Sequence, residues 1–187
     1  MREDPDLNWK NTRAGYGALP IALHWLMLLL VAGAYAAMEL RSIFPKASPE
    51  REAMASWHYL LGLSVFFLVW LRLLARLPGV APVVEPALAA PQATLARLVQ
   101  WALYALMAGL PLLGWLTLSA KGGPVPFLGV ELPLLVGKSA ELARSFKKLH
   151  EAGATLGYLL IGLHAGAALY HHYVRRDNTL KLMLPAA

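Results

Sequence analysis

Four apolar stretches decide what this chain can fold into. They cover residues 18–38, 54–77, 94–118 and 148–174, and each has about the 20 residues that a helix needs to cross the hydrocarbon of a bilayer. Only 15% of the residues are charged, against about a quarter in a soluble globular domain. A membrane-spanning segment must pair its own backbone groups, so each stretch is expected to be helical. The sequence therefore predicts a single all-α transmembrane domain, residues 1–187, built as a four-helix bundle.

The apolar stretches contain histidines at matched depths. His24 lies near the beginning of the first stretch and His58 near the beginning of the second, while His150 and His164 both lie in the fourth. The last two are 14 residues apart, close to four helical turns, so they leave one helix face about 21 Å apart along the axis. Ionisable residues inside a membrane usually face the bundle interior and have a function. The alternative is that each is a neutral histidine bonded to a neighbouring helix.

Depth decides how these histidines pair. The chain crosses the membrane four times, so His24 and His164 lie toward the side of the termini, and His58 and His150 lie toward the opposite side. Two separated pairs fit the two axial positions of haem iron, whereas tetrahedral zinc sites need three or four close ligands. The sequence thus predicts two bis-histidine b-type haems. Cysteine is absent, which excludes thiolate-ligated haem, covalent haem attachment and iron–sulfur clusters.

Several other residues are candidates for the two sites. Gly62 and Gly157 follow histidines on the same helix faces and would let a flat macrocycle approach, although small residues also pack membrane helices in general. Arg72 and Arg76 could contact haem propionates or lipid phosphates. His171 and His172, at the end of the fourth stretch, are possible members of a quinone site as proton donors, or else interfacial histidines bonded to water.

The first apolar stretch could instead be a cleaved signal peptide, because Ala34-Tyr35-Ala36 resembles a cleavage site. Its length, the acidic residues before it and the histidine within it favour a retained span. With four spans both termini lie on one side. That side carries nine of the 17 basic residues: Arg2, Lys10, Arg13, Arg72, Arg76, Arg97, Arg175, Arg176 and Lys181. This small excess, with Arg175 and Arg176 directly after a span, favours cytoplasmic termini.

The opposite face is unusually basic for an exterior surface. It carries the other eight basic residues: Arg41, Lys46, Arg51, Lys121, Lys138, Arg144, Lys147 and Lys148. A positive surface attracts anions, which would account for this surplus.

The order of these residues resembles the bacterial di-haem cytochrome b-561 family, most closely its membrane-bound superoxide oxidase members. The similarity covers nearly the whole chain and is weakest in residues 78–91 and in the long loop 119–147. It is carried by these segments: Ile21-Ala22-Leu23-His24-Trp25, Ala37-Met38-Glu39-Leu40-Arg41 with Phe44-Pro45-Lys46, His58 with Gly62, Arg72-Leu73-Leu74-Ala75-Arg76, Leu156-Gly157-Tyr158, Ile161-Gly162-Leu163-His164, Ala167-Ala168-Leu169, His171-His172-Tyr173, Asp177-Asn178-Thr179-Leu180 and Met183-Leu184-Pro185.

The resemblance implies a reaction. Superoxide would give up its electron on the outer, periplasmic face, and the electron would pass through two haems, ligated by the four histidines already named, to ubiquinone. Lys147, Arg41 and Lys46 are the best candidates for attracting superoxide, although each could be an ordinary solvated residue. The expected partners are superoxide, ubiquinone and the lipid of a bacterial inner membrane, with no nucleic acid and no obligate protein partner.

Two other functions use the same ligands. The chain could be an electron-transfer subunit that links a partner dehydrogenase or hydrogenase to the quinone pool, which predicts a docking surface and co-purification with a soluble enzyme. It could also be a haem-binding sensor or assembly factor without turnover, which predicts redox change or haem loss without quinone reduction.

Overall fold

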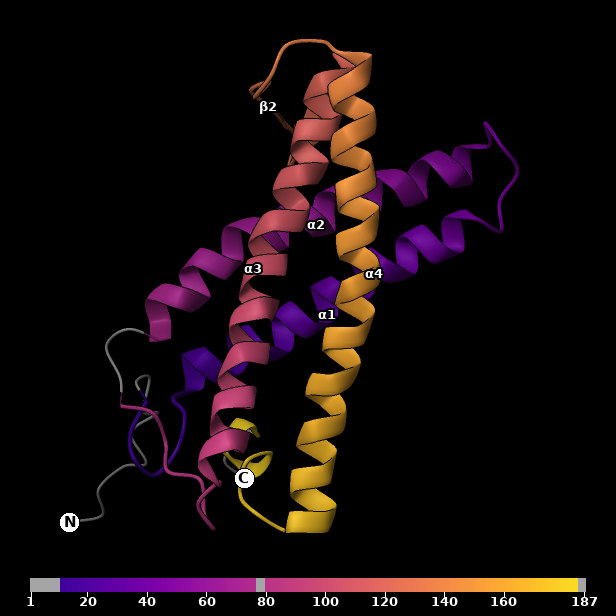
Figure 1. Ribbon diagram of the computed structural model, residues 1–187. Helices are drawn as coiled ribbons and strands as arrows, with labels where there is room; N and C mark the ends of the chain where they lie inside the picture. The colour runs from indigo at the N-terminus through magenta and orange to yellow at the C-terminus, as the bar shows by residue number, and fades with distance from the viewer. Residues whose placement is uncertain (1–10, 77–79, 185–187) are drawn as a thin grey trace, which may run out of the picture. The chain divides into compact units, whose positions relative to one another are not determined.

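A computed structural model describes residues 11–76 and 80–184, and Figure 1 shows its four long helices. They are α1 (Ala18–Arg41), α2 (Pro49–Arg76), α3 (Ala90–Lys121) and α4 (Ala140–Tyr170), all long and apolar enough to cross a membrane. The predicted helical fold with four spans is therefore confirmed. Arg2 and Lys10, which entered the orientation argument, lie outside the described residues.

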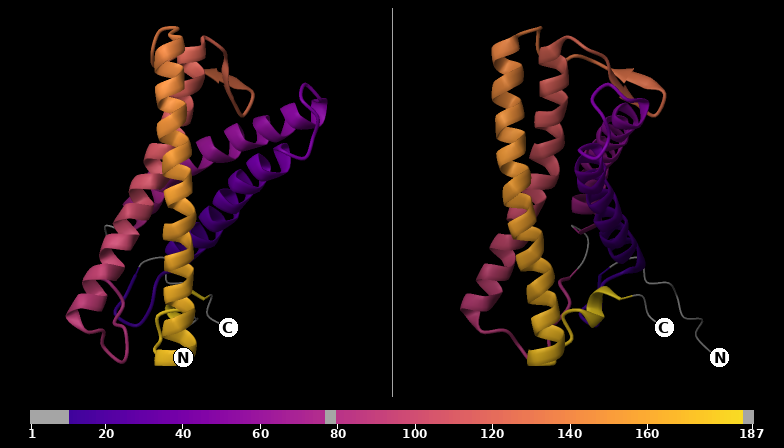
Figure 2. Two further views of the ribbon diagram at one scale, coloured as in Figure 1. Left: turned by 45° about the vertical axis from the view of Figure 1, so that its right-hand side comes forward. Right: turned by 90° about the vertical axis from the view of Figure 1, so that its right-hand side faces the viewer.

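Helices α2 and α4 begin earlier than their apolar stretches, and a serine caps each of them. Pro49 opens α2, and the Ser48 hydroxyl before it accepts a hydrogen bond of 3.2 Å from the Arg51 N–H. Ser139 caps α4 in the same way through the Leu142 N–H at 3.3 Å. A serine cap pairs a backbone donor that has no intrahelical acceptor, and proline is favoured in the first turn. The segment 141–148, which is rich in charged residues, thus forms the first turns of α4 (Figure 2).

Short elements complete the chain. A two-stranded antiparallel hairpin, β1 (Val125–Phe127) and β2 (Val130–Leu132), lies in the loop between α3 and α4, and the sequence analysis did not predict it. Its turn residues Leu128 and Gly129 both have positive φ, at 49° and 83°. After α4 the chain forms a π-helical turn, η1 (His171–Arg175), and a 3₁₀ turn, η2 (Lys181–Met183).

The internal contacts divide the chain into two compact units, and each takes a part of all four helices. The terminal unit contains residues 1–26, 70–103 and 159–187, and the loop unit contains residues 27–69 and 104–158. His24 and His164 belong to the terminal unit, whereas His58 and His150 belong to the loop unit. Each predicted histidine pair therefore lies within one unit.

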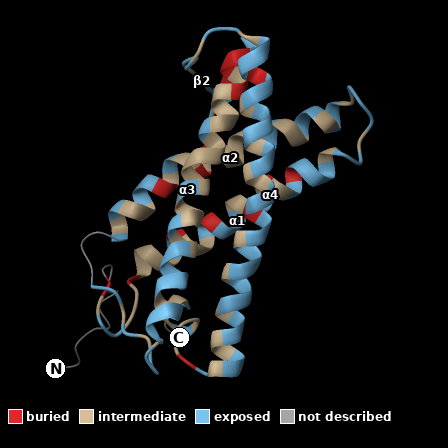
Figure 3. Cartoon of the chain, viewed as in Figure 1, coloured by how far each residue is buried: buried red, intermediate tan, exposed pale blue. Residues whose placement is uncertain are grey.

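Few of the described residues are buried, as the colouring in Figure 3 shows. The loop unit has a small core of Met27, Val65 and Val69, with partly buried apolar residues packed around it. Large apolar side chains on the helices face outward, including Leu29, Leu74 and Leu159. Outward-facing leucines are what helices in contact with lipid require, since lipid rather than the protein interior accepts this apolar surface.

Candidate functional site: two histidine pairs

The loop unit brings His58 of α2 and His150 of α4 together. Their ring centroids are 5.9 Å apart and the ring planes are inclined by 80°. His58 Nδ1 lies 2.9 Å from the Ala34 carbonyl oxygen, and His150 Nδ1 lies 2.8 Å from that of Leu110. A carbonyl can only accept, so both Nδ1 atoms carry the proton and donate it. Each Nε2 is therefore left with a lone pair that can bind a metal.

The terminal unit brings His24 of α1 and His164 of α4 together in the same manner. Their centroids are 6.2 Å apart and their planes are inclined by 68°. Here Arg72 Nη2 lies 3.0 Å from His24 Nδ1. A guanidinium can only donate, so this Nδ1 is the acceptor and the proton of a neutral His24 is on Nε2.

Both separations fit an iron atom held between two imidazoles. Two metal–nitrogen bonds of about 2 Å, with about 1.1 Å from each nitrogen to its ring centre, give about 6 Å between centroids. In the described part of the chain no group of three or more histidine, cysteine or acidic side chains gathers as a metal site. The loop-unit pair fits in hydrogen bonding as well as in distance. The terminal-unit pair fits in distance, but binding through His24 Nε2 would require Arg72 to release Nδ1.

Glycines open space beside the loop-unit pair. A Cβ atom added at Gly62 would meet nothing within 4 Å, and one added at Gly114 would lie 3.6 Å from His150 Cε1. Gly114 thus lies beside His150, and the sequence did not single it out because it belongs to α3, which contains no histidine. At Gly157 a Cβ would collide with the hydroxyl of Tyr35 instead. Gly157 therefore makes room for a tyrosine.

Beyond α4, His171 forms a dyad with Asp177. His171 Nδ1 lies 2.5 Å from Asp177 Oδ2, and the Thr179 N–H donates to Oδ1 at 3.0 Å. The Asp177 side chain is fully buried, and Arg175 Nε lies 3.5 Å from the same Oδ2. Burial alone would raise the pKa of Asp177, but the hydrogen bonds from His171 and Thr179, with the charge of His171, outweigh it and hold this pKa below its ordinary value. The neighbouring His172 contributes a buried Nδ1 that has no hydrogen-bond partner among the described residues.

Asp177 appeared in the sequence only as part of a resembling segment, and its role comes from the turn that follows α4. Arg176 takes a left-handed conformation with φ 58°, and the Asp177 N–H bonds back to the His171 carbonyl at 3.2 Å. This reversal of the chain carries the carboxylate back to the ring six residues earlier. The next residue, Asn178, is bonded to Val83 and Glu85 of the connector before α3.

The depressed pKa of Asp177 predicts an acid-sensitive junction at the end of α4. Its carboxyl has a lower pKa in the folded chain than the ordinary value of 3.8, so the stabilisation is complete above that value and is lost as pH falls through the folded pKa. We expect proteolysis of the C-terminal segment to accelerate between about pH 4 and pH 2. Acid-stable pepsin, used on purified protein across that range, would measure it. Asp177→Asn should be cleaved at a rate with much weaker pH dependence, and equal pH dependence in the two proteins would contradict this prediction.

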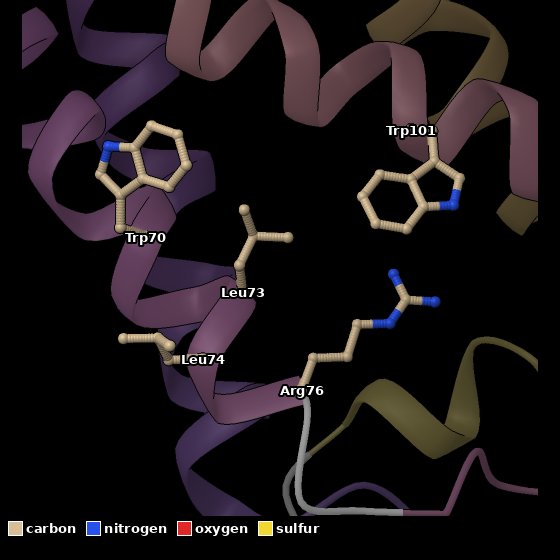
Figure 4. A pocket seen from close by; sticks show the side chains of 5 residues that line it. All are labelled: Trp70, Leu73, Leu74, Arg76 and Trp101. Carbon is tan, nitrogen blue, oxygen red and sulfur yellow. The ribbon is translucent and has the colours of Figure 1, made fainter.

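The two candidate arginines, Arg72 and Arg76, have different neighbours in the terminal unit. Arg72 contacts His24, whereas Arg76 extends toward Trp101 with its guanidinium carbon 6.0 Å from the ring centroid (Figure 4). Arg76 also donates to Gln100 Oε1 at 3.4 Å. Arg76 and Trp101 line an apolar pocket of about 660 Å³ together with Trp70, Leu73 and Leu74. Arg72 is thus the arginine next to a histidine pair.

The basic residues of the loop unit are not equivalent. Lys46 is exposed, whereas Lys147 forms an ion pair of 2.7 Å with Glu151, one helical turn later. Arg51 donates through Nη1 to the carbonyls of Arg41 and Phe44, at 2.9 and 3.0 Å, and so stabilises the turn between α1 and α2. Among the described residues Lys46 and Arg41 form no ion pair with an acidic side chain, while the charge of Lys147 is partly balanced by Glu151.

Comparison with known proteins points to one family. The family described as prokaryotic cytochrome b561 matches residues 15–186. Cytochrome b561 homolog 1 of Escherichia coli (strain K12) is 42% identical over 165 residues, which cover 88% of this chain and 94% of that protein. Probable superoxide oxidase CybB of Yersinia pestis is 35% identical over 170 residues, covering 91% and 96%. Cytochrome b561 homolog 2 of Escherichia coli (strain K12) is 29% identical over 185 residues, covering 95% of each chain.

Proposed function

The chain belongs to the prokaryotic cytochrome b561 family, a family of membrane electron-transfer proteins that bind b-type haem, and we propose that it oxidises superoxide and reduces ubiquinone. This membership confirms the resemblance found in the sequence. The observation that carries the proposal is the presence of two histidine pairs, each spaced for one iron, at centroid separations of 5.9 and 6.2 Å. A carrier of single electrons with two such sites suits a one-electron donor and a two-electron acceptor.

We assign the ligands as the sequence analysis predicted them, with His58 and His150 at the outer haem and His24 and His164 at the inner haem. The haems would supply reversible one-electron carriers between the substrates. Ala34 and Leu110 fix the outer histidines by accepting their Nδ1 protons. Arg72 is the residue best placed to turn from His24 toward a propionate, and Gly62 and Gly114 leave space for the macrocycle.

The substrates differ in what they need from the protein. Oxidation of superoxide removes one electron and moves no proton, so a positive outer face with Lys46 and Arg41 is sufficient. Reduction of ubiquinone consumes two electrons and two protons, so two superoxide anions are oxidised to dioxygen for each quinol formed. The His171–Asp177 dyad offers a proton donor held by a buried carboxylate. We therefore propose that the termini lie in the cytoplasm of a bacterium and that the hairpin lies outside its inner membrane.

The proposal draws specific support from the relative at 35% identity that is named a probable superoxide oxidase. The relative at 42% identity has a general name. An electron-transfer subunit that serves a protein donor would use the same histidines, so activity must separate the two functions.

A superoxide pulse provides the test. We expect superoxide to reduce the oxidised, purified protein rapidly and ubiquinone to reoxidise it. The reduction rate should fall as salt is raised from about 0.01 to about 0.5 M, because ions screen the positive outer face. Stopped-flow absorbance of the haem bands measures both steps. A protein that superoxide leaves oxidised, but that a quinol reduces, would contradict the proposal and indicate a protein electron donor.

A matched pair of variants tests the role of surface charge. Lys46→Gln removes an exposed outer charge, and Arg97→Gln removes a charge from the predicted inner side. We expect the first to slow reduction by superoxide about two- to three-fold at low salt and the second to leave it unchanged. Equal effects of the two variants would show that net charge, rather than the charge of the outer face, sets the rate.

A further inference from the structure

Two consecutive residues of α1 contact the helices of both proposed outer ligands. The Ala34 carbonyl accepts from His58 Nδ1 of α2 at 2.9 Å. The Tyr35 hydroxyl donates to the Ala154 carbonyl of α4 at 2.8 Å. Ala154 lies one helical turn after His150. This part of α1 therefore fixes the ring of one histidine directly and the helix that carries the other histidine.

The Tyr35 contact depends on a glycine of α4. A Cβ atom at residue 157 would collide with the Tyr35 hydroxyl and would lie 3.4 Å from its Cζ, so only glycine lets the phenol reach the α4 backbone. Gly157 is itself buried. The sequence made Gly157 a candidate for haem packing, but in the structure this glycine makes room for Tyr35.

A second tyrosine holds the first in place. The Tyr158 ring lies edge-on to that of Tyr35, with centroids 4.4 Å apart, which is a favourable aromatic geometry. Its hydroxyl donates to Glu39 Oε1 at 2.7 Å, and Glu39 lies one turn beyond Tyr35 on α1. The hydroxyls of Tyr35 and Tyr158 therefore form two separate bonds between α1 and α4, and all these residues belong to the loop unit.

We propose that Tyr35 is a positioning residue for the outer haem, which it serves by fixing α4, and hence His150, relative to the ring of His58. This inference rests on the proposed ligation of the outer haem by these two histidines. Their planes are inclined by 80°, and the relative orientation of two axial imidazoles determines the shape of the ferric low-spin EPR signal. Groups that hold metal ligands in place commonly contribute about ten-fold or more to metal affinity. Tyr35 acts through the backbone, so its effect belongs at the lower end of this range.

Three variants of the full-length, haem-loaded protein test the proposal. Tyr35→Phe removes only the hydroxyl, Gly157→Ala displaces it, and the double variant has both changes. The outer signal is identified as the one lost in His58→Ala. We expect each single variant to shift or broaden that EPR signal and to speed loss of the outer haem to a haem-scavenging protein about ten-fold. The inner signal should not change.

The double variant distinguishes a specific contact from general damage. Phenylalanine at 35 has no hydroxyl for the alanine methyl to meet, so the double variant should resemble Tyr35→Phe alone. Gly162→Ala serves as the matched control, because a Cβ there meets nothing within 4 Å. It lies two residues before His164, and residues two apart on a helix do not share a face. Tyr173→Phe, at an exposed tyrosine of η1, controls for loss of a phenol.

The outcomes are separable. Unchanged outer signals in both single variants, or effects that add in the double variant, would overturn the role of Tyr35. If Gly157→Ala fails to fold, Tyr35→Phe still decides, since it adds no atoms. If His58→Ala retains both haems, the ligand assignment itself fails, and that failure is independent of any result for Tyr35.

Discussion

Replacing His58 by alanine is expected to lower the haem content from the proposed two per chain to about one and to abolish the proposed reduction by superoxide. In the proposed ligation the alanine removes one of the two axial nitrogens, and His150 alone is a weaker site. His24 and His164 belong to a different unit, so the inner haem should remain and should still exchange electrons with ubiquinone. Haem assay by extraction and redox titration of the haem bands measure the loss.

His150→Ala should give the same phenotype, because we propose that both histidines bind one iron. Tyr59→Phe provides a control next to His58 that leaves both histidines intact. Retention of two haems in His58→Ala would contradict the ligand assignment. Loss of both haems in a folded protein would contradict the independence of the two pairs.

Replacing His171 by asparagine is expected to lower ubiquinone turnover about 100-fold while leaving reduction by superoxide unchanged. An asparagine amide can still donate to Asp177 and so keep the turn after α4, but it cannot deliver a proton. His172→Asn should have a smaller effect, since the described structure pairs the buried carboxylate with His171.

Separate measurement of the two half-reactions locates the defect. Stopped-flow reduction by superoxide reports the outer half, and quinol formation reports the inner half. A fall in both rates would indicate structural damage. A full rate of quinol formation in His171→Asn would remove the dyad from the proton path and leave quinone protonation to another group.

Much of the histidine arrangement could be predicted because it depends on properties that are local in sequence. Helical periodicity places His150 and His164 on one face of α4, and the need to cross a bilayer alternates the direction of successive spans. The depth of each histidine in the membrane then allows only one way to pair them. The structure brings together the same two pairs. Whether these pairs bind haem stays a proposal that the variants above test.

Other residues could not be identified in advance. Asp177 reaches His171 only because a left-handed residue at Arg176 reverses the chain, and a single sequence does not show that turn. The hairpin of β1 and β2 is too short to produce a clear alternating pattern. Arg72 and Arg76 lie one turn apart on α2, yet they have different neighbours, a histidine for one and a tryptophan for the other.

The sequence by itself determined the membrane class, the four spans and the pairing of the histidines, because hydropathy and helical period follow directly from the order of residues. Only the tertiary structure decided the contacts around these histidines, in which Ala34 and Leu110 accept from His58 and His150 and Gly157 admits Tyr35. These are contacts between residues 24 to 122 positions apart. Their geometry depends on the rotation of each helix about its axis, which a hydropathy pattern leaves undefined.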